Sequence, residues 1–296
     1  MHNQQSQGII PTVTRGHIER LSSFKSNFVS RRHIDVWLPN SYNSKNSYPV
    51  LYIHDGQMLF DAAITWNKQS WQVAETMDSL INEQRIQACI VVGIWNVSDE
   101  RHSDYFPQKP FNMLPQTYLD EMQKKIEQND PRALFAKSIN SDNYLQFITK
   151  ELKPRIDQTY ATQANKESTF VAGSSMGGLI SLYALCEYPD VFSGAACLST
   201  HWVGTLTSKQ NPIPDTFIRY LDKHLPPANR HQIYFDYGTE TLDALYEPHQ
   251  KRVDELMRSK GYTETNWQTL RFEGDDHSER SWRKRLHYPL TFLLTT

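Results

Sequence analysis

Six short and almost continuously apolar runs constrain the fold of this chain more than any other feature of its 296 residues. Runs of this kind are typical of strands that helices cover on both faces of a parallel sheet. Two earlier runs, TVTRGHIERL and FVSRRHIDVWLP, alternate apolar and polar side chains, which indicates half-exposed antiparallel strands. The six buried runs span residues 49–55, 88–96, 168–174, 193–199, 232–238 and 267–274.

Helical patterns separate these runs. They cover residues 70–85, 142–157, 175–188 and 242–260. Alternating strands and helices predict an α/β fold, with a mostly parallel central sheet, an antiparallel N-terminal edge and helices on both faces. We expect a single domain over residues 1–296, because α/β sheets of about this length often form one unit.

Residues 103–141 break the alternation. They contain four prolines and a short helical pattern near 116–128. A connection this long within a compact domain is usually a lid or a binding loop. We therefore expect a lid-like insertion, with a passive surface excursion as the alternative. The prolines are Pro107, Pro110, Pro115 and Pro131.

Charge and composition exclude several classes of partner. With 31 basic and 33 acidic side chains the net charge is −2, so no basic face for nucleic acid is expected. No apolar run is long enough to span a membrane, and the N-terminus lacks the apolar segment of a signal peptide. Cys89, Cys186 and Cys197 are odd in number and lack metal-ligand spacing, which indicates buried free thiols in a cytoplasmic protein without a metal site.

The segment FVAGSSMGGL carries the strongest motif, G-x-S-x-G, with Ser175 at its centre. An apolar run precedes the motif and a helical pattern follows it, which is the context of a nucleophile elbow. Gly173 and Gly177 lack the Cβ atoms that would clash in so tight a turn. The N–H of Met176, at the start of the helix, is predicted to donate to a developing oxyanion. Ser174 lies off the centre of the motif.

A catalytic serine needs a general base. On the α/β-hydrolase template the acid and then the histidine follow the serine along the chain. His277 lies in the loop between the last strand and the last helix, so we expect it to be the base. His201 follows an earlier strand and precedes the acid segment, which favours a position lining the pocket. His249 and His287 fall in helical segments and are expected to be surface or packing residues.

Two acids follow the strand predicted at residues 232–238. Glu240 lies two residues past Gly238, and Asp243 lies five past it. A residue near the strand tip still reaches the imidazole, whereas one further on is expected to enter the helix and cap its N–H groups. We therefore expect Glu240 to be the acid, with Asp243 as the alternative.

A second oxyanion donor is expected in the loop after residues 49–53. Gly56 lets the chain turn there, and a backbone N–H near Gln57 is predicted to point at the site. An ordinary Asp-Gly turn is the alternative. For substrate binding we expect aromatic and basic side chains near strand ends, each with core or rim packing as its alternative: Trp66, Trp71, Arg101, Trp202 and His201.

At these residues the chain resembles the esterase D family of α/β-hydrolases, which includes ferric-enterobactin-type esterases, S-formylglutathione hydrolases, and feruloyl and acetyl carbohydrate esterases. The resembling segments are YPVLYIHDGQMLFD, IVVGIWN, YLQFITKELKPRIDQTY, FVAGSSMGGLISLYAL and GDDHSERSWRKRL. The resemblance implies an esterase with a Ser–acid–His triad and no metal or organic cofactor. It places the nucleophile on Ser175 and the base on His277. The chain departs from the family at the acid, where many relatives carry Asp.

The sequence therefore predicts a serine carboxylesterase that acts on a small-molecule ester, such as an acylated sugar or an aryl ester. Thioester hydrolysis and acyl transfer use the same triad and are the nearest alternatives. A binding protein of the same fold without catalysis is the alternative from another class, and it would be expected to lack part of the triad.

Overall fold

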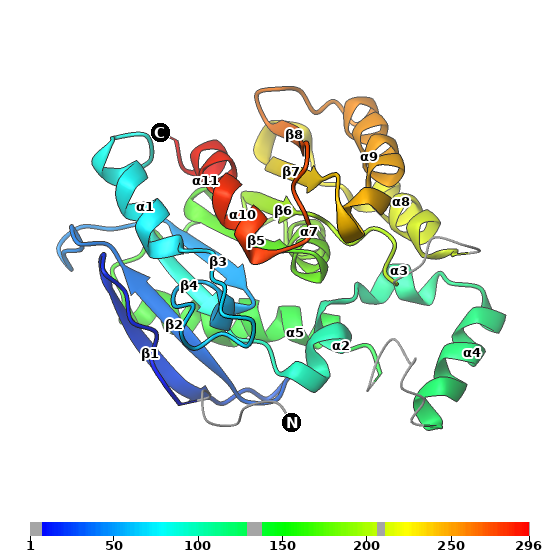
Figure 1. Ribbon diagram of the computed structural model, residues 1–296, viewed down its shortest axis with the longest axis horizontal. Helices are drawn as coiled ribbons and strands as arrows, with labels where there is room; N and C mark the ends of the chain where they lie inside the picture. Colours follow the sequence, from blue (N-terminus) through cyan, green and yellow to red (C-terminus); the bar gives the residue numbers. More distant parts are fainter. Residues whose placement is uncertain (1–7, 129–137, 206–210, 296) are drawn as a thin grey trace.

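Eight strands form one sheet in the residues that the computed structural model describes, namely 8–128, 138–205 and 211–295. Their order is β1-β2-β4-β3-β5-β6-β7-β8 (Figure 1). Strands β1 and β2 run antiparallel at one edge, and β3 to β8 are parallel. The α/β architecture predicted from the apolar runs is confirmed. The strands are β1 (His17–Phe24), β2 (Arg32–Leu38), β3 (Val50–His54), β4 (Ile90–Ile94), β5 (Thr169–Ser174), β6 (Gly194–Leu198), β7 (Gln232–Gly238) and β8 (Trp267–Phe272).

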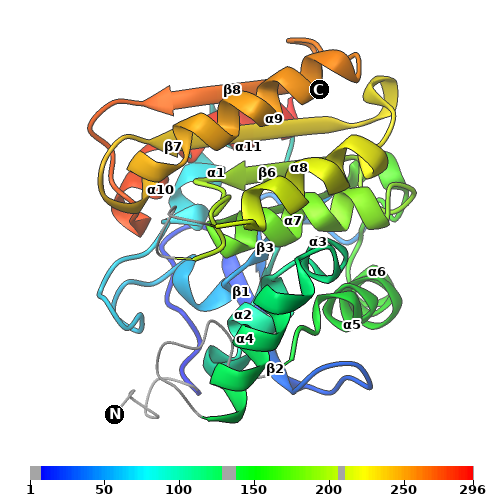
Figure 2. The same cartoon turned by 90° about the vertical axis from the view of Figure 1, so that its right-hand side faces the viewer.

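Helices cover both faces of the sheet. Figures 1 and 2 show α1, α10 and α11 on the opposite side from α7, α8 and α9. The α-helices are α1 (Val73–Asn82), α2 (Arg101–Tyr105), α3 (Gln108–Asn112), α4 (Gln116–Glu127), α5 (Ser141–Gln146), α6 (Lys153–Thr159), α7 (Met176–Glu187), α8 (Ile213–His224), α9 (Glu247–Ser259), α10 (Glu279–Arg285) and α11 (His287–Leu294). Shorter turns are η2 (Gly56–Met58), η3 (Ser98–Glu100), η5 (Lys166–Ser168), η6 (Ala228–Arg230) and η7 (Thr241–Leu245), and η4 (Phe147–Leu152) is a π-helix that joins α5 to α6.

Side chains alternate between two apolar clusters, one on each face of the sheet. In β3, Val50 and Tyr52 join the cluster under α7 and α8, whereas Leu51 and Ile53 join the cluster under α1 and α11. All four are at most 1% exposed, which explains why the run reads as continuously apolar rather than alternating. The central strands β3, β4, β5 and β6 are therefore buried on both faces, whereas the edge strands β1 and β8 are partly exposed.

Helix α8 is absent from the sequence prediction. Its first turn contains prolines that resemble loop residues, although Pro is tolerated in the first turn, where N–H groups have no intrahelical acceptor. The pattern expected over 242–260 instead divides into η7 and α9.

The insertion expected at residues 103–141 has a buried base and an outer helix. Tyr105 and Phe106 are fully buried in the main apolar cluster, and the Phe106 ring packs 5.5 Å from the Phe217 ring of α8. Helix α4 lies further out, at the right of Figure 1. The start of this segment is thus core rather than a detachable lid, while Pro131 lies outside the described residues.

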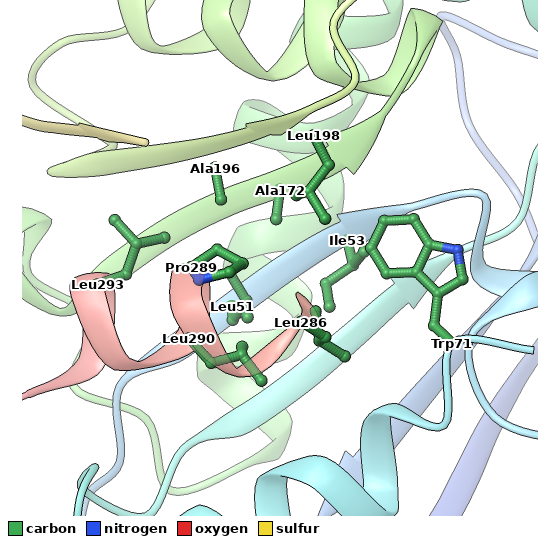
Figure 3. Close-up of a pocket in the computed structure, with 10 residues that line it drawn as sticks. All are labelled: Leu51, Ile53, Trp71, Ala172, Ala196, Leu198, Leu286, Pro289, Leu290 and Leu293. Carbon is green, nitrogen blue, oxygen red and sulfur yellow. The ribbon is translucent and has the colours of Figure 1, made fainter. Parts of the chain in front are cut away.

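A small apolar cavity of about 10 Å³ lies between the sheet and α11 (Figure 3). It has room for about one water molecule and offers that water no polar partner, so it is a packing gap. Trp71 lines this cavity and is 1% exposed, so its predicted role in binding substrate is wrong. The cysteines Cys89, Cys186 and Cys197 are buried and free, as the sequence predicts.

Candidate active site

Ser175 occupies a sharp turn between β5 and α7. Its backbone has φ 58° and ψ −121°, a conformation that costs an L-residue on the order of 1–3 kcal/mol. Backbone hydrogen bonds hold it there: the Ser175 N–H donates to the Leu198 carbonyl at 2.9 Å, and its carbonyl accepts from the N–H groups of Gly178, Leu179 and His201. A Cβ on Gly173 would stand 2.6 Å from the Gly177 backbone, so the turn requires glycine at position 173.

His277 lies between β8 and α10 and faces Ser175. Its Nε2 is 3.0 Å from Ser175 Oγ, and its Nδ1 is 2.5 Å from Asp243 Oδ1. The His277 backbone N–H donates to Thr241 Oγ1 at 2.9 Å, which ties the histidine loop to the turn that carries the acid. The structure therefore brings the two residues predicted as nucleophile and base into hydrogen-bond contact.

Asp243, rather than Glu240, contacts His277, so the expectation of Glu240 is wrong. The Glu240 side chain is exposed to solvent. Its backbone N–H donates to the Asp275 carbonyl at 3.0 Å. Thr241, at φ 54°, starts the turn η7, which folds the next residues back under the strand tip. Asp243 consequently lies next to Nδ1 of the His277 imidazole, and the Gly238 N–H donates to its Oδ2 at 2.6 Å.

The environment of Asp243 favours its charged form. Burial would raise the pKa of this carboxyl, but hydrogen bonds from His277, Ser199 and the Gly238 N–H lower it below the usual value. Its side chain is fully buried. A buried, ionised carboxylate can orient an imidazole and stabilise the imidazolium that forms when the serine proton is transferred.

The loop after β3 lies beside the elbow. Asp55 adopts φ 58° and ψ 44°, and a Cβ on Gly56 would stand 2.6 Å from the Gly93 backbone, so the loop packs tightly against β4. A Cβ on Gly177 would lie 3.6 Å from Asp55 Oδ2, which places this loop against the start of α7. The N–H groups at the start of a helix lack intrahelical acceptors, which leaves Met176 N–H available at the predicted position.

Arg101 holds this loop in place rather than standing free to bind substrate. Its Nε and Nη2 donate to the two oxygens of Asp55 at 2.8 and 2.7 Å. Asn96 Nδ2 adds a bond to Asp55 Oδ1 at 2.6 Å, and the Asn96 N–H donates to Gln57 Oε1 at 3.1 Å. Bidentate pairs of this kind fix geometry as well as charge. Asn96 and the start of α2, which lead into the insertion, therefore hold the predicted oxyanion loop in place.

Two other residues expected to bind substrate have different surroundings. Trp202 is 2% exposed, packs on Phe235 and donates its indole N–H to Gln250 at 2.8 Å, so it is a core residue and not part of a binding surface. Trp66 is 77% exposed on a loop that bonds to the histidine region through Asn67 and Glu279 at 2.7 Å. Its position stays compatible with a binding role.

His201 reaches the site together with Tyr246, which sequence reasoning missed. The two side chains share a hydrogen bond of 2.7 Å, and the Tyr246 ring lies 5.8 Å from the His277 ring. Burial and the nearby His277, His102 and Arg101 lower the pKa of His201 to about 3, so it is neutral. Tyr246 gives no sequence signal beyond its position three residues after Asp243.

Among the described residues, no three His, Cys, Asp or Glu side chains gather as a metal site. Within the same ranges, no helix is both long enough and apolar enough to cross a membrane.

Comparisons with known proteins show the family and the fold of this chain. The family model described as "Putative esterase" matches residues 26–293. Uncharacterized protein YbbA of Bacillus subtilis (strain 168) is 25% identical over 82% of this chain and 84% of its own length. Ferri-bacillibactin esterase BesA of the same organism is 24% identical over 74% of this chain and 69% of its own length.

Solved structures share the fold. A ferulic acid esterase superposes with a TM-score of 0.64 at 18% identity, covering 95% of this chain and 98% of that one. The enterobactin esterase FES of Shigella flexneri gives 0.66 at 17% identity, covering 96% of this chain and 60% of that one. Because the family model spans nearly the whole chain, this protein belongs to the esterase family and is a hydrolase of ester bonds.

Proposed function

We propose that the protein is a serine carboxylesterase in which Ser175, His277 and Asp243 form the catalytic triad. The observation that carries the proposal is the continuous hydrogen-bonded path from Ser175 Oγ through His277 to Asp243, with distances of 3.0 and 2.5 Å. Nucleophile, base and orienting acid stand in the order that acyl transfer requires.

Acylation begins when Ser175 Oγ attacks the carbonyl carbon of the ester and His277 Nε2 takes the hydroxyl proton. The carbonyl oxygen becomes an oxyanion, to which the N–H groups of Met176 and Gln57 donate. Asp243 stabilises the imidazolium and keeps Nε2 facing the serine. The tetrahedral intermediate collapses, the bond to the alcohol oxygen breaks, and His277 returns the proton to this leaving oxygen.

Deacylation repeats these steps with water as the nucleophile. His277 accepts a proton from water, the resulting hydroxide adds to the acyl carbon, and the bond to Ser175 Oγ breaks as the proton returns to serine. The neutral His201 and Tyr246 share a hydrogen bond near His277, so they make the site polar without adding charge. No step requires a metal or an organic cofactor.

We infer that the substrate carries a planar ring near its ester bond. Trp66 supports this inference because it is the most exposed of the predicted binding aromatics and its loop is bonded to the histidine region. Related proteins named as ferulic acid and enterobactin esterases point to aryl esters as the first compounds to test. An acylated sugar is the second class, since aromatic side chains also stack on sugar rings.

Ester hydrolysis by Ser175→Ala tests the proposal, with Ser174→Ala as the matched control. Each variant loses one serine hydroxyl, and the two serines are adjacent in the same turn. A panel of aryl and sugar esters should show a loss of about 10⁴- to 10⁶-fold in kcat for Ser175→Ala and little change for Ser174→Ala. Activity of Ser175→Ala within tenfold of the unmodified protein would refute the triad, whereas an unmodified protein that hydrolyses none of the esters would favour a binding function.

A further inference from the structure

A buried polar network lies beneath Asp243, on the side away from His277. Asp243 Oδ2 accepts a hydrogen bond from Ser199 Oγ at 2.6 Å. Ser199 Oγ in turn lies 2.9 Å from the indole nitrogen of Trp282 and 2.7 Å from Arg285 Nη2. Indole and guanidinium nitrogens only donate, so they occupy both lone pairs of the hydroxyl, and its single proton must point at Asp243.

Arg285 brings a buried positive charge to this network. Its side chain is 1% exposed, and its Nη2 lies 3.0 Å from Asp236 Oδ1 and 3.7 Å from Asp243 Oδ2. Its Nη1 lies 3.3 Å from Asp275 Oδ2. The guanidinium is thus shared among three carboxylates, and it reaches Asp243 mainly through the hydroxyl of Ser199.

The backbone of Ser199 is held in an unusual conformation that places this hydroxyl. Its φ is 42°, in the left-handed region that favours glycine. The Ser199 N–H donates to two oxygens of Asp236, the backbone carbonyl oxygen at 2.9 Å and Oδ1 at 3.1 Å. A serine at a position where glycine is easier indicates that its side chain has a role there.

We propose that Ser199 is a positioning residue of this esterase. Its hydroxyl links Arg285 to Asp243, keeps the Asp243 carboxylate ionised and orients it toward His277. The inference rests on the proposed triad and deepens it. Ser199 touches neither the nucleophile nor the base, and its effect on the reaction passes through Asp243.

Loss of the hydroxyl has a predictable effect on proton affinity. The pair formed by His277 and Asp243 carries one negative charge when it is active. Loss of a hydrogen-bond donor to that charge raises the proton affinity of the pair. The pair then takes up its inactivating proton at a higher pH. The charged or titratable groups around Asp243 that remain in such a variant are His277, His201, Tyr246, Asp236, Asp275 and Arg285.

The test compares Ser199→Gly and Ser199→Ala with Ser181→Ala. Glycine suits the φ of 42° at position 199, so it removes the hydroxyl without adding strain. Ser181 is an equally buried serine whose hydroxyl donates to the Gly177 carbonyl of its own helix at 2.7 Å, and it does not contact the triad. Profiles of kcat/KM against pH are measured on an aryl ester and normalised to sites titrated with a fluorophosphonate, so that misfolded protein is not counted.

In both Ser199 variants kcat should fall by about 10- to 100-fold, with KM nearly unchanged. This is the effect expected from the loss of one hydrogen bond to a charged group. The acidic limb of their profiles should move up by roughly half a pH unit or more, while that of Ser181→Ala stays in place. Arg285→Lys should move the limb in the same direction, and its effect should not add to that of Ser199→Gly, because both act through one contact.

An acidic limb that does not move in either Ser199 variant would overturn the proposal, because a purely structural defect lowers the titre of active sites without moving the limb. Additive effects of Arg285→Lys and Ser199→Gly would also overturn it. Failure of the proposed function looks different: the unmodified protein would then hydrolyse none of the esters and take no label.

Discussion

The identity of the acid is the sharpest prediction at the scale of single residues. Asp243→Asn keeps the shape of the side chain but removes the charge that orients His277, so kcat should fall by about 10²- to 10⁴-fold. Glu240→Gln, three residues earlier on the exposed surface, should stay within about twofold. Steady-state kinetics of the two folded variants decide between them, and the opposite ranking would restore Glu240 as the acid.

The contact between Ser175 and His277 could be predicted from the sequence because both residues have strong local signals, a glycine-bracketed turn and a loop after the last strand. The position of Asp243 could not, because it depends on the left-handed Thr241 and the short turn that it starts. Trp71 and Trp202 were expected to line the site, but burial in three dimensions assigns both to the core. Tyr246 reaches the site only because of the same turn.

At the scale of elements, the tight turn between β5 and α7 predicts unequal effects for its two glycines. A Cβ at position 173 would meet Gly177 backbone at 2.6 Å, which cannot move without displacing α7, whereas a Cβ at position 177 would meet His54 Cβ at 3.4 Å. Gly173→Ala should therefore cost about 1–3 kcal/mol or more and slow labelling of Ser175 at least tenfold. Gly177→Ala should change the stability and the labelling rate far less. Thermal melting and fluorophosphonate labelling rates test this order, and equal effects would contradict it.

The insertion should divide into two parts with different effects on stability. Phe106→Ala empties a fully buried position and should cost about 3–5 kcal/mol. Replacing α4 (Gln116–Glu127) by a short Gly-Ser linker should move the melting temperature little, because most of its side chains whose burial is known are exposed. If α4 acts as the predicted lid, the same variant changes the preferred size of the ester. Unfolding on loss of α4 would show instead that the outer helix supports the core.

The strands and the helices α1, α7 and α9 could be predicted because their apolar patterns are local. The sequence gives weaker guidance for α2, whose buried end depends on partners distant in sequence. Arg32 Nη2 donates to Asp104 at 2.8 Å inside the protein, and the Tyr105 hydroxyl accepts from the Asp55 N–H at 3.2 Å. Such contacts turn a segment that reads as a loop into part of the core.

For the molecule as a whole, two buried histidines predict loss of stability in acid. Burial lowers the pKa of His54 and of His201 to about 3, against 6.5 for the unfolded chain. The unfolded chain therefore binds more protons between these values. The stability that comes from keeping each ring neutral is complete above pH 6.5 and is lost as the pH falls toward 3.

Comparison with His201→Gln isolates one of these protons. Between pH 6 and pH 4 the free energy of unfolding of this variant should fall less steeply than that of the unmodified protein, by about 1.4 kcal/mol per pH unit. Asp236, whose pKa burial raises to about 6, acts in the opposite sense in both proteins, so its effect cancels in the comparison. Urea denaturation across this pH range measures the slopes. Identical slopes would mean that His201 is already charged in the folded protein.

If Ser175 is the activated nucleophile of this ester hydrolase, as we propose, a reagent that modifies activated serines should react with it. The unmodified protein is treated with a fluorophosphonate at neutral pH, digested and mapped by mass spectrometry. We expect one adduct, on the peptide that contains Ser175, with labelling strongly slowed in His277→Ala. An unlabelled protein, or an adduct on Ser174 or any other residue with Ser175 unmodified, would contradict it.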